Sequence, residues 1–136
     1  MASFPSITSV LSEAFYPNSA VETFNHLWYL SGMEKRKPHY ALTRVKALIK
    51  QGAYRVTRTA LRCAARDFRF IEASQLAECV LEFEVKHFYK SMTTLNDPAL
   101  WQDVYHPEIK GTSAYVKIQI VDDATVVISF KLLEDE

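Results

Sequence analysis

The spacing of the apolar residues changes near Glu84, and this change constrains the fold more than any other feature of the sequence. Before Glu84, apolar residues recur every three or four positions, which is the period of an amphipathic helix. After it they alternate with polar residues, which is typical of strands with one buried face. A helical region followed by consecutive strands predicts an α+β domain, in which N-terminal helices pack on one face of an antiparallel sheet.

Three helices are expected before the change. The first begins near Leu42 and ends before Gly52, because glycine favours the left-handed backbone that closes many helices. The second begins near Thr57 or Thr59, since either side chain can cap it. The third covers about residues 72–83, where the helical spacing returns.

The strands that follow are expected over residues 85–94, 101–105, 115–121 and 125–131. The last two form a hairpin around Asp122-Asp123, and two sets of apolar residues share one face of each strand: Val116, Ile118 and Ile120, then Val126, Ile128 and Phe130. Both sets can face the core only if the loop has an odd number of residues. A three-residue loop, 122–124, pairs Ile118 with Ile128 and Val116 with Phe130. It places Tyr115 opposite Lys131 on the outer face, beside Lys117, and this indicates a site.

The charges are unevenly distributed, although the net charge is zero. Residues 35–69 carry eleven basic residues against Asp67 alone, while the flanking segments are acidic. Such a block is typical of proteins with polyanionic partners, and a solvated helix surface explains it about as well on charge alone. Arg58, Arg62 and Arg66 follow one another at i, i+4 and i+8, and no acid relieves their repulsion. This favours an arginine row that faces phosphates.

Residues 1–32 contain six of the aromatic residues and no Lys or Arg, and a basic block opens at Met33. Two interpretations are open: a genuine N-terminal extension, or upstream sequence included by a start codon assigned too early, which we favour. The domain proper is then expected at 33–136. A secretory signal needs a positive region before its apolar run, and none is present. No segment approaches the roughly 18 apolar residues of a membrane span. The two cysteines, Cys63 and Cys79, exclude a disulfide framework, so a reducing, cytoplasmic compartment is expected.

The sequence contains no motif typical of a serine or cysteine nucleophile, a phosphate-binding glycine loop or a carboxylate dyad. The four histidines have no metal-ligand spacing and are each interpreted as surface or packing residues. Neither a metal nor a cofactor is expected. The remaining Lys, Gln, Tyr and Arg residues suit metal-free work on a phosphodiester, in which cations stabilise charge on the phosphate.

Several sequence blocks resemble the MqsR toxins, the motility quorum-sensing regulator family of mRNA-cleaving toxins in bacterial toxin–antitoxin pairs. They are residues 33–36 (MEKR), 88–94 (FYKSMTT), 101–105 (WQDVY), 115–118 (YVKI) and 129–131 (SFK), with Pro107 and Gly111 between them. The resemblance covers about residues 33–131. It implies a RelE-like fold and a type II toxin that cleaves mRNA without the ribosome, at GC-containing codons such as GCU.

The resemblance also implies catalytic roles for Lys90, Gln102, Tyr115 and Lys131. For Gln102, a structural amide that bonds across strands is nearly as plausible. The implied partners are mRNA and an MqsA-like antitoxin, with operator DNA reached only through the antitoxin. The RNA-binding residues expected of the enzyme are Arg58, Arg62, Arg66 and Lys117. The competing class is a non-catalytic nucleic-acid-binding co-regulator of transcription that uses the arginine row on DNA.

The expected mechanism is attack of the RNA 2′-hydroxyl on the adjacent phosphate. Lys90 and Lys131 would stabilise the transition state, and Gln102 would orient the phosphate or a base edge. Tyr115 would donate to a phosphate oxygen or assist the leaving group. The general base is left open. The acidic end at residues 132–136 departs from the family, and it favours an electrostatic role for Lys131 over proton transfer.

Overall fold

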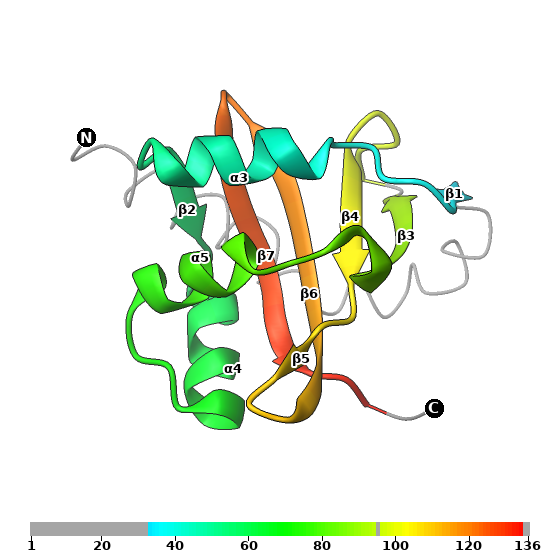
Figure 1. The fold of residues 1–136 in the computed structure, drawn as a ribbon. Helices are drawn as coiled ribbons and strands as arrows, with labels where there is room; N and C mark the ends of the chain where they lie inside the picture. Colours follow the sequence, from blue (N-terminus) through cyan, green and yellow to red (C-terminus); the bar gives the residue numbers. More distant parts are fainter. Residues whose placement is uncertain (1–32, 95, 135–136) are drawn as a thin grey trace.

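A computed structural model of the chain describes residues 33–94 and 96–134, so the expected N-terminal segment, 1–32, lies outside the described residues. The sheet contains seven strands in the order β1-β3-β4-β6-β7-β2, with β5 paired to β6 (Figure 1). In chain order the elements are β1 (Glu34–Lys35), α3 (Leu42–Lys50), β2 (Tyr54–Val56), α4 (Arg58–Phe68), α5 (Ala73–Leu81), the 3-10 helix η3 (Val85–His87), β3 (Phe88–Thr93), β4 (Trp101–Tyr105), β5 (Glu108–Ile109), β6 (Thr112–Val121) and β7 (Ala124–Leu132).

The α+β class is confirmed, but two details of the predicted architecture are wrong. The helices do not form a separate N-terminal block, because β1 precedes α3 and β2 lies between α3 and α4. The sheet is also not purely antiparallel, since β2 pairs in parallel with β7. Strands of two or three residues are too short to show an alternating pattern, so the sequence could not indicate them.

The predicted ends of the first two helices are confirmed at their caps. Gly52 has φ +82° beyond the end of α3, where its N–H donates to the Ile49 carbonyl over 2.9 Å. That positive φ is the conformation glycine adopts without strain. Of the two candidate caps for α4, Thr57 is the one used, since its Oγ1 accepts from the Ala60 N–H at 3.0 Å.

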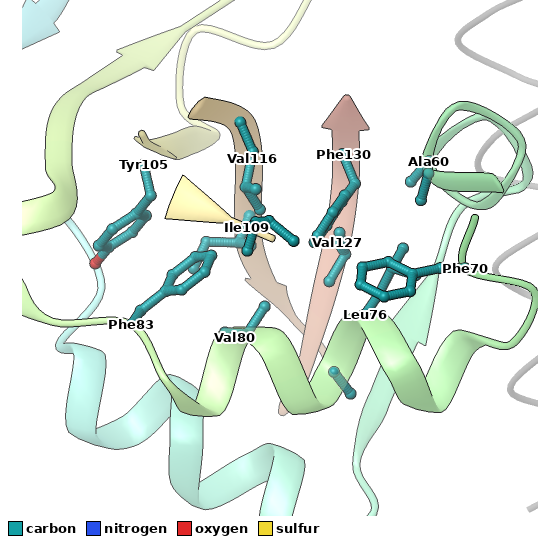
Figure 2. Packing of buried hydrophobic residues seen from close by; sticks show 14 of the residues in the cluster. Ala60, Phe70, Leu76, Val80, Phe83, Tyr105, Ile109, Val116, Val127 and Phe130 are labelled. Atoms are coloured by element: carbon teal, nitrogen blue, oxygen red, sulfur yellow. The ribbon is translucent and has the colours of Figure 1, made fainter. Parts of the chain in front are cut away.

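The core lies between the helices and one face of the sheet. Side chains of α5, including Leu76 and Val80, point toward Val116, Val127 and Phe130 on β6 and β7 (Figure 2). α3 and α5 cross this face, whereas α4 runs beside β7 below β2 (Figure 1). We call the opposite side of the sheet the outer face. None of the helices in the described part of the chain is long and apolar enough to span a membrane.

The predicted register of the last hairpin is confirmed in part. Val116 pairs with Phe130 and Tyr115 with Lys131, but Ile118 pairs with Val127 rather than Ile128. The loop is the two-residue turn Asp122-Asp123, with φ of 53° and 56°, and the register shifts between Lys117 and Ile118. A β-bulge on β7 therefore supplies the odd residue that was expected in the loop. As a consequence Val127, and not Ile128, belongs to the core cluster.

Helix α4 closes the edge of β7 that β2 leaves uncovered. Thr57 Oγ1 donates to the Ile128 carbonyl over 2.9 Å, and Asp67 Oδ2 accepts from the Leu132 N–H over 2.9 Å. Unpaired backbone groups at a sheet edge are otherwise a site for aggregation. Both ends of α4 are thus attached to β7, and this attachment fixes the position of Lys131, the neighbour of Leu132.

The segment before α3 is held against β4 by one buried carboxylate. Asp103 is fully buried, and its oxygens accept from the backbone N–H groups of His39 and Tyr40 at 3.0–3.1 Å. The Lys35 ammonium lies 4.2 Å from the centroid of the Trp101 ring. These contacts hold β1 beside β3, where Glu34 pairs with Met92.

Candidate active site

A hollow of about 360 Å³ opens on the outer face, where β3, β6 and the end of β7 meet. Its lining includes Tyr89, Lys90, His106, Tyr115, Lys131 and Glu134. Tyr115 and Lys131 reach it because their neighbours along each strand, Val116 and Phe130, face the core. The alternation that buries one set of side chains therefore presents the other set to the hollow.

The structure brings together three of the four predicted catalytic residues. Lys90, Tyr115 and Lys131 come from three strands, and all line the hollow. The Lys131 Nζ lies 5.4 Å from the centroid of the Tyr115 ring, its partner across the hairpin. Two ammonium groups and a phenol around one cavity form a site suited to an anionic ligand such as a phosphate.

A β-bulge in β3 directs Lys90 into the hollow. Phe88 packs against the core, so strict alternation would turn Lys90 to that side as well. The register shifts between Phe88 and Lys90, with Tyr89 as the extra residue. Both Tyr89 and Lys90 consequently face the hollow, as is common for bulges beside functional sites.

Lys90 is fixed by an ion pair that the sequence did not indicate. Its Nζ lies 2.7 Å from Glu34 Oε2, and the Lys90 side chain is 21% exposed. Glu34 belongs to β1, which lies 56 positions earlier in the chain. Because β1 has only two residues, no periodic signal in the sequence could place this carboxylate beside β3.

Gln102 lies apart from the other three predicted catalytic residues. Its side chain is buried and does not line the hollow. Its Nε2 donates to Gln119 Oε1 over 3.1 Å, from β4 to the neighbouring strand β6. This bond is the one expected of a structural cross-strand amide, the second interpretation of Gln102.

The predicted RNA-binding arginines lie on the exposed side of α4. Arg58, Arg62 and Arg66 are all exposed, and Arg66 forms a two-point ion pair with Asp67 at 2.7 and 3.0 Å. The Arg66 hydrogen bonds hold the pKa of Asp67 below its usual value. The row therefore reaches the end of β7, next to the hollow. Lys117 is half-buried on β6, two residues from Tyr115 and outside the lining of the hollow.

His106 also lines the hollow, whereas the sequence indicated only a surface or packing histidine. Its ring stacks on Tyr89, with centroids 4.2 Å apart and planes at 19°, and its centroid lies 5.9 Å from that of Tyr115. Burial lowers the pKa of His106, and the nearby Lys90 ammonium lowers it further. His106 lies between the WQDVY block and Pro107, but only the folded arrangement of β3, β4 and β6 reveals that its ring lines the hollow.

Tyr115 is suited to donate rather than accept a proton. Burial, and to a lesser degree Tyr89, raises the pKa of the Tyr115 phenol above its ordinary value. The hydroxyl therefore keeps its proton at neutral pH. Among residues 33–94 and 96–134, no three His, Cys, Asp or Glu side chains are grouped so that they could hold a metal ion.

Comparison with known proteins identifies the family. The family model described as "Motility quorum-sensing regulator, toxin of MqsA" matches residues 37–132. The mRNA interferase toxin MqsR of Escherichia coli (strain K12) is 39% identical over 99 residues, which are 73% of this chain and 98% of that protein. The family-model match contains the strands that form the hollow. The chain therefore belongs to the motility quorum-sensing regulator family, the toxins of MqsA.

Proposed function

We propose that this chain is the toxin of a type II toxin–antitoxin system and acts as an mRNA endoribonuclease. The observation that carries the proposal is the convergence of Lys90, Tyr115 and Lys131 on one hollow in a chain 39% identical to an mRNA interferase toxin. The proposal includes cleavage without the ribosome, at GC-containing codons, in the cytoplasm. It also includes a RelE-like fold, supported by the order β3-β4-β6-β7 with helices against one face.

The reaction begins with attack of the RNA 2′-hydroxyl on the adjacent phosphorus. The O2′–P bond forms and the P–O5′ bond breaks, which leaves a 2′,3′-cyclic phosphate and a 5′-hydroxyl. Lys90 and Lys131 stabilise the additional negative charge on the phosphate oxygens. Tyr115 donates its proton to the leaving O5′. Since the RNA supplies its own nucleophile, the reaction requires no metal ion.

The partners follow from the family and from the charge on the surface. An MqsA-like antitoxin is the expected protein partner, and operator DNA is contacted only through it. Arg58, Arg62 and Arg66 bind the RNA backbone beside the hollow, and Lys117 adds a contact on the outer face. Gln102 acts on the phosphate only through a rearrangement of its bond to Gln119, or else serves as a structural amide.

The direct test is digestion of a synthetic mRNA by the purified full chain in EDTA. We expect cleavage to persist and the 3′ ends to carry a cyclic phosphate, identified by mass spectrometry. A 3′-hydroxyl end, or cleavage that requires added Mg²⁺, would contradict the mechanism. RNA binding without any cleavage would favour the alternative, a non-catalytic co-regulator of transcription.

A further inference from the structure

The proposed reaction needs a group that takes the proton of the 2′-hydroxyl, and three of the charged or titratable side chains around the hollow are unsuited to it. Lys90 and Lys131 carry ammonium groups, and Lys90 is paired with Glu34 at 2.7 Å. Tyr115 keeps its phenol proton at neutral pH, as argued above. A general base works best when its pKa lies near the operating pH, which points to an imidazole.

The His106 ring is held in a defined position beside Lys90 and Tyr115. It stacks on Tyr89 at 4.2 Å, and its backbone N–H donates to the His87 carbonyl over 2.8 Å. The ring and the main chain of His106 are therefore both held in place. A positioned ring is what proton transfer requires, because a small misplacement of a catalytic group costs much of the rate.

One nitrogen of this ring is enclosed without a hydrogen-bond partner. Nε2 of His106 is buried and has no partner among residues 33–94 and 96–134. An orphaned buried polar atom is destabilising, and a histidine that only filled space would not need to carry this cost. Since Nε2 is enclosed, Nδ1 is the ring nitrogen left to accept a proton from a ligand.

We propose that His106 is the general base of the reaction, accepting the 2′-hydroxyl proton at Nδ1. This inference rests on the proposed endoribonuclease function. The O2′–H proton moves to Nδ1 as the O2′–P bond forms, while the P–O5′ bond breaks and O5′ takes the phenol proton of Tyr115. Solvent then returns the proton from the imidazolium to the phenolate, so that the enzyme is restored with no net change in protons.

The titratable and charged groups that line the hollow with His106 influence the pH at which its imidazole ionises. They are Tyr89 and Lys90 from β3, Tyr115 from β6, Lys131 from β7 and Glu134 from the segment after β7. Burial and the Lys90 ammonium both lower the pKa of His106. The base is neutral and active above that lowered pKa, so cleavage should fall as the pH drops through it and be level near neutral pH.

The test uses single-turnover cleavage at saturating RNA by the full chain and two variants. His106→Phe keeps an aromatic ring between Tyr89 and Tyr115, and His106→Gln keeps polar atoms without an imidazole. We expect both to cleave about 100-fold more slowly or worse and to lose the acidic limb of the pH–rate profile. Their affinity for an RNA with a 2′-deoxy sugar at the cleavage position, measured by fluorescence anisotropy, should be unchanged.

The comparison variant is Glu134→Gln, since Glu134 is the other side chain of the lining that could accept a proton. Whatever its rate, it should keep the acidic limb of the pH–rate profile that the His106 variants lose. If either His106 variant folds and cleaves at the wild-type rate with the acidic limb intact, His106 is not the base, although the endoribonuclease function stands. Loss of the acidic limb in Glu134→Gln would likewise overturn the assignment. Absence of cleavage by the wild-type chain would instead refute the proposed function itself.

Discussion

The two faces of the sheet are built from the same strands yet differ in almost every physical property. Toward the helices, Val116 and Phe130 are fully buried in an apolar cluster. Toward the outer face, the adjacent residues Tyr115 and Lys131 line a polar hollow. Residues that stabilise the core and residues that line the hollow are therefore adjacent along β6 and β7. Substitutions at neighbouring positions should therefore affect different measurements.

The largest expected effect is on the core side. Phe130→Ala removes a fully buried ring that meets Phe68 and Phe70 edge to face, with centroids 5.7 and 5.9 Å away. The loss of buried area and the cavity left behind should lower the free energy of unfolding by about 3–5 kcal/mol. Urea denaturation followed by circular dichroism measures this. A change below about 1 kcal/mol would show that Phe130 is not part of a closely packed core.

On the outer face, one residue further along β7, Lys131→Ala should leave folding nearly unchanged and slow cleavage by about 100-fold or more. Tyr115→Phe, which removes only the hydroxyl, should slow cleavage similarly. Because the proposed roles of both groups are in the transition state, the affinity for an uncleavable RNA should hardly change. Rapid-quench assays at saturating RNA, with thermal unfolding as a control for folding, distinguish these effects. A loss of affinity with normal turnover would move both residues out of the active site.

The helix-covered face was largely predictable from the sequence, because its signals are local. Thr57 caps α4 and Gly52 closes α3, and in each case the residue type alone indicates the helix end. The alternation in β6 and β7 also gave the Tyr115–Lys131 pair correctly. The bulge at Ile128 was missed because one extra residue has the same effect on which side chains face the core, whether it lies in the strand or in the loop.

The hollow was predictable only where the hairpin register or a family resemblance supplied the residues. Glu34 and His106 were missed, since neither belongs to a periodic pattern and each meets Lys90 through tertiary contacts. A bulge at Tyr89 directs Lys90 into the hollow, and no sequence rule predicts that position. Such contacts form only in the folded chain. In a chain of 136 residues, many other pairs of residues fit the local sequence patterns equally well.

Asp67 connects the two regions and should show this in the pH dependence of stability. Arg66 holds the pKa of Asp67 below its unfolded value, so its stabilising effect is present above about pH 4 and is lost as the pH falls through the folded pKa. Asp67→Asn should therefore lower the free energy of unfolding by about 1–2 kcal/mol at neutral pH. The difference from wild type should shrink below pH 4. An equal difference at all pH values would contradict a role for the charged carboxylate.

The arginine row should affect binding rather than chemistry. Arg62→Ala removes one exposed cation from α4, and each lost phosphate contact should reduce the log–log salt slope of RNA binding by about 0.7 on single strands. Titrations at several salt concentrations measure the slope. Lys50→Ala, an exposed lysine at the end of α3, is a matched control that should leave it unchanged. Equal slopes for Arg62→Ala and wild type would remove Arg62 from the RNA path.

The smallest effect is expected from removal of residues 1–32. The family match begins at residue 37, and 99 residues of this chain cover 98% of the relative from Escherichia coli. A chain that begins at Met33 should therefore fold and cleave RNA at the rate of the full chain. Parallel thermal unfolding and cleavage assays compare the two. A stability loss of several kcal/mol would show that the N-terminal residues pack against the domain.

In the proposed function, cleavage occurs in the hollow of the outer face and not along the arginine row. The most direct measurement compares single-turnover cleavage by Lys131→Ala and Arg62→Ala, both at saturating RNA and both verified as folded. We predict near-normal cleavage for Arg62→Ala and a loss of about 100-fold or more for Lys131→Ala. Abolished cleavage in Arg62→Ala together with retained cleavage in Lys131→Ala would place the active site on α4 and contradict the account.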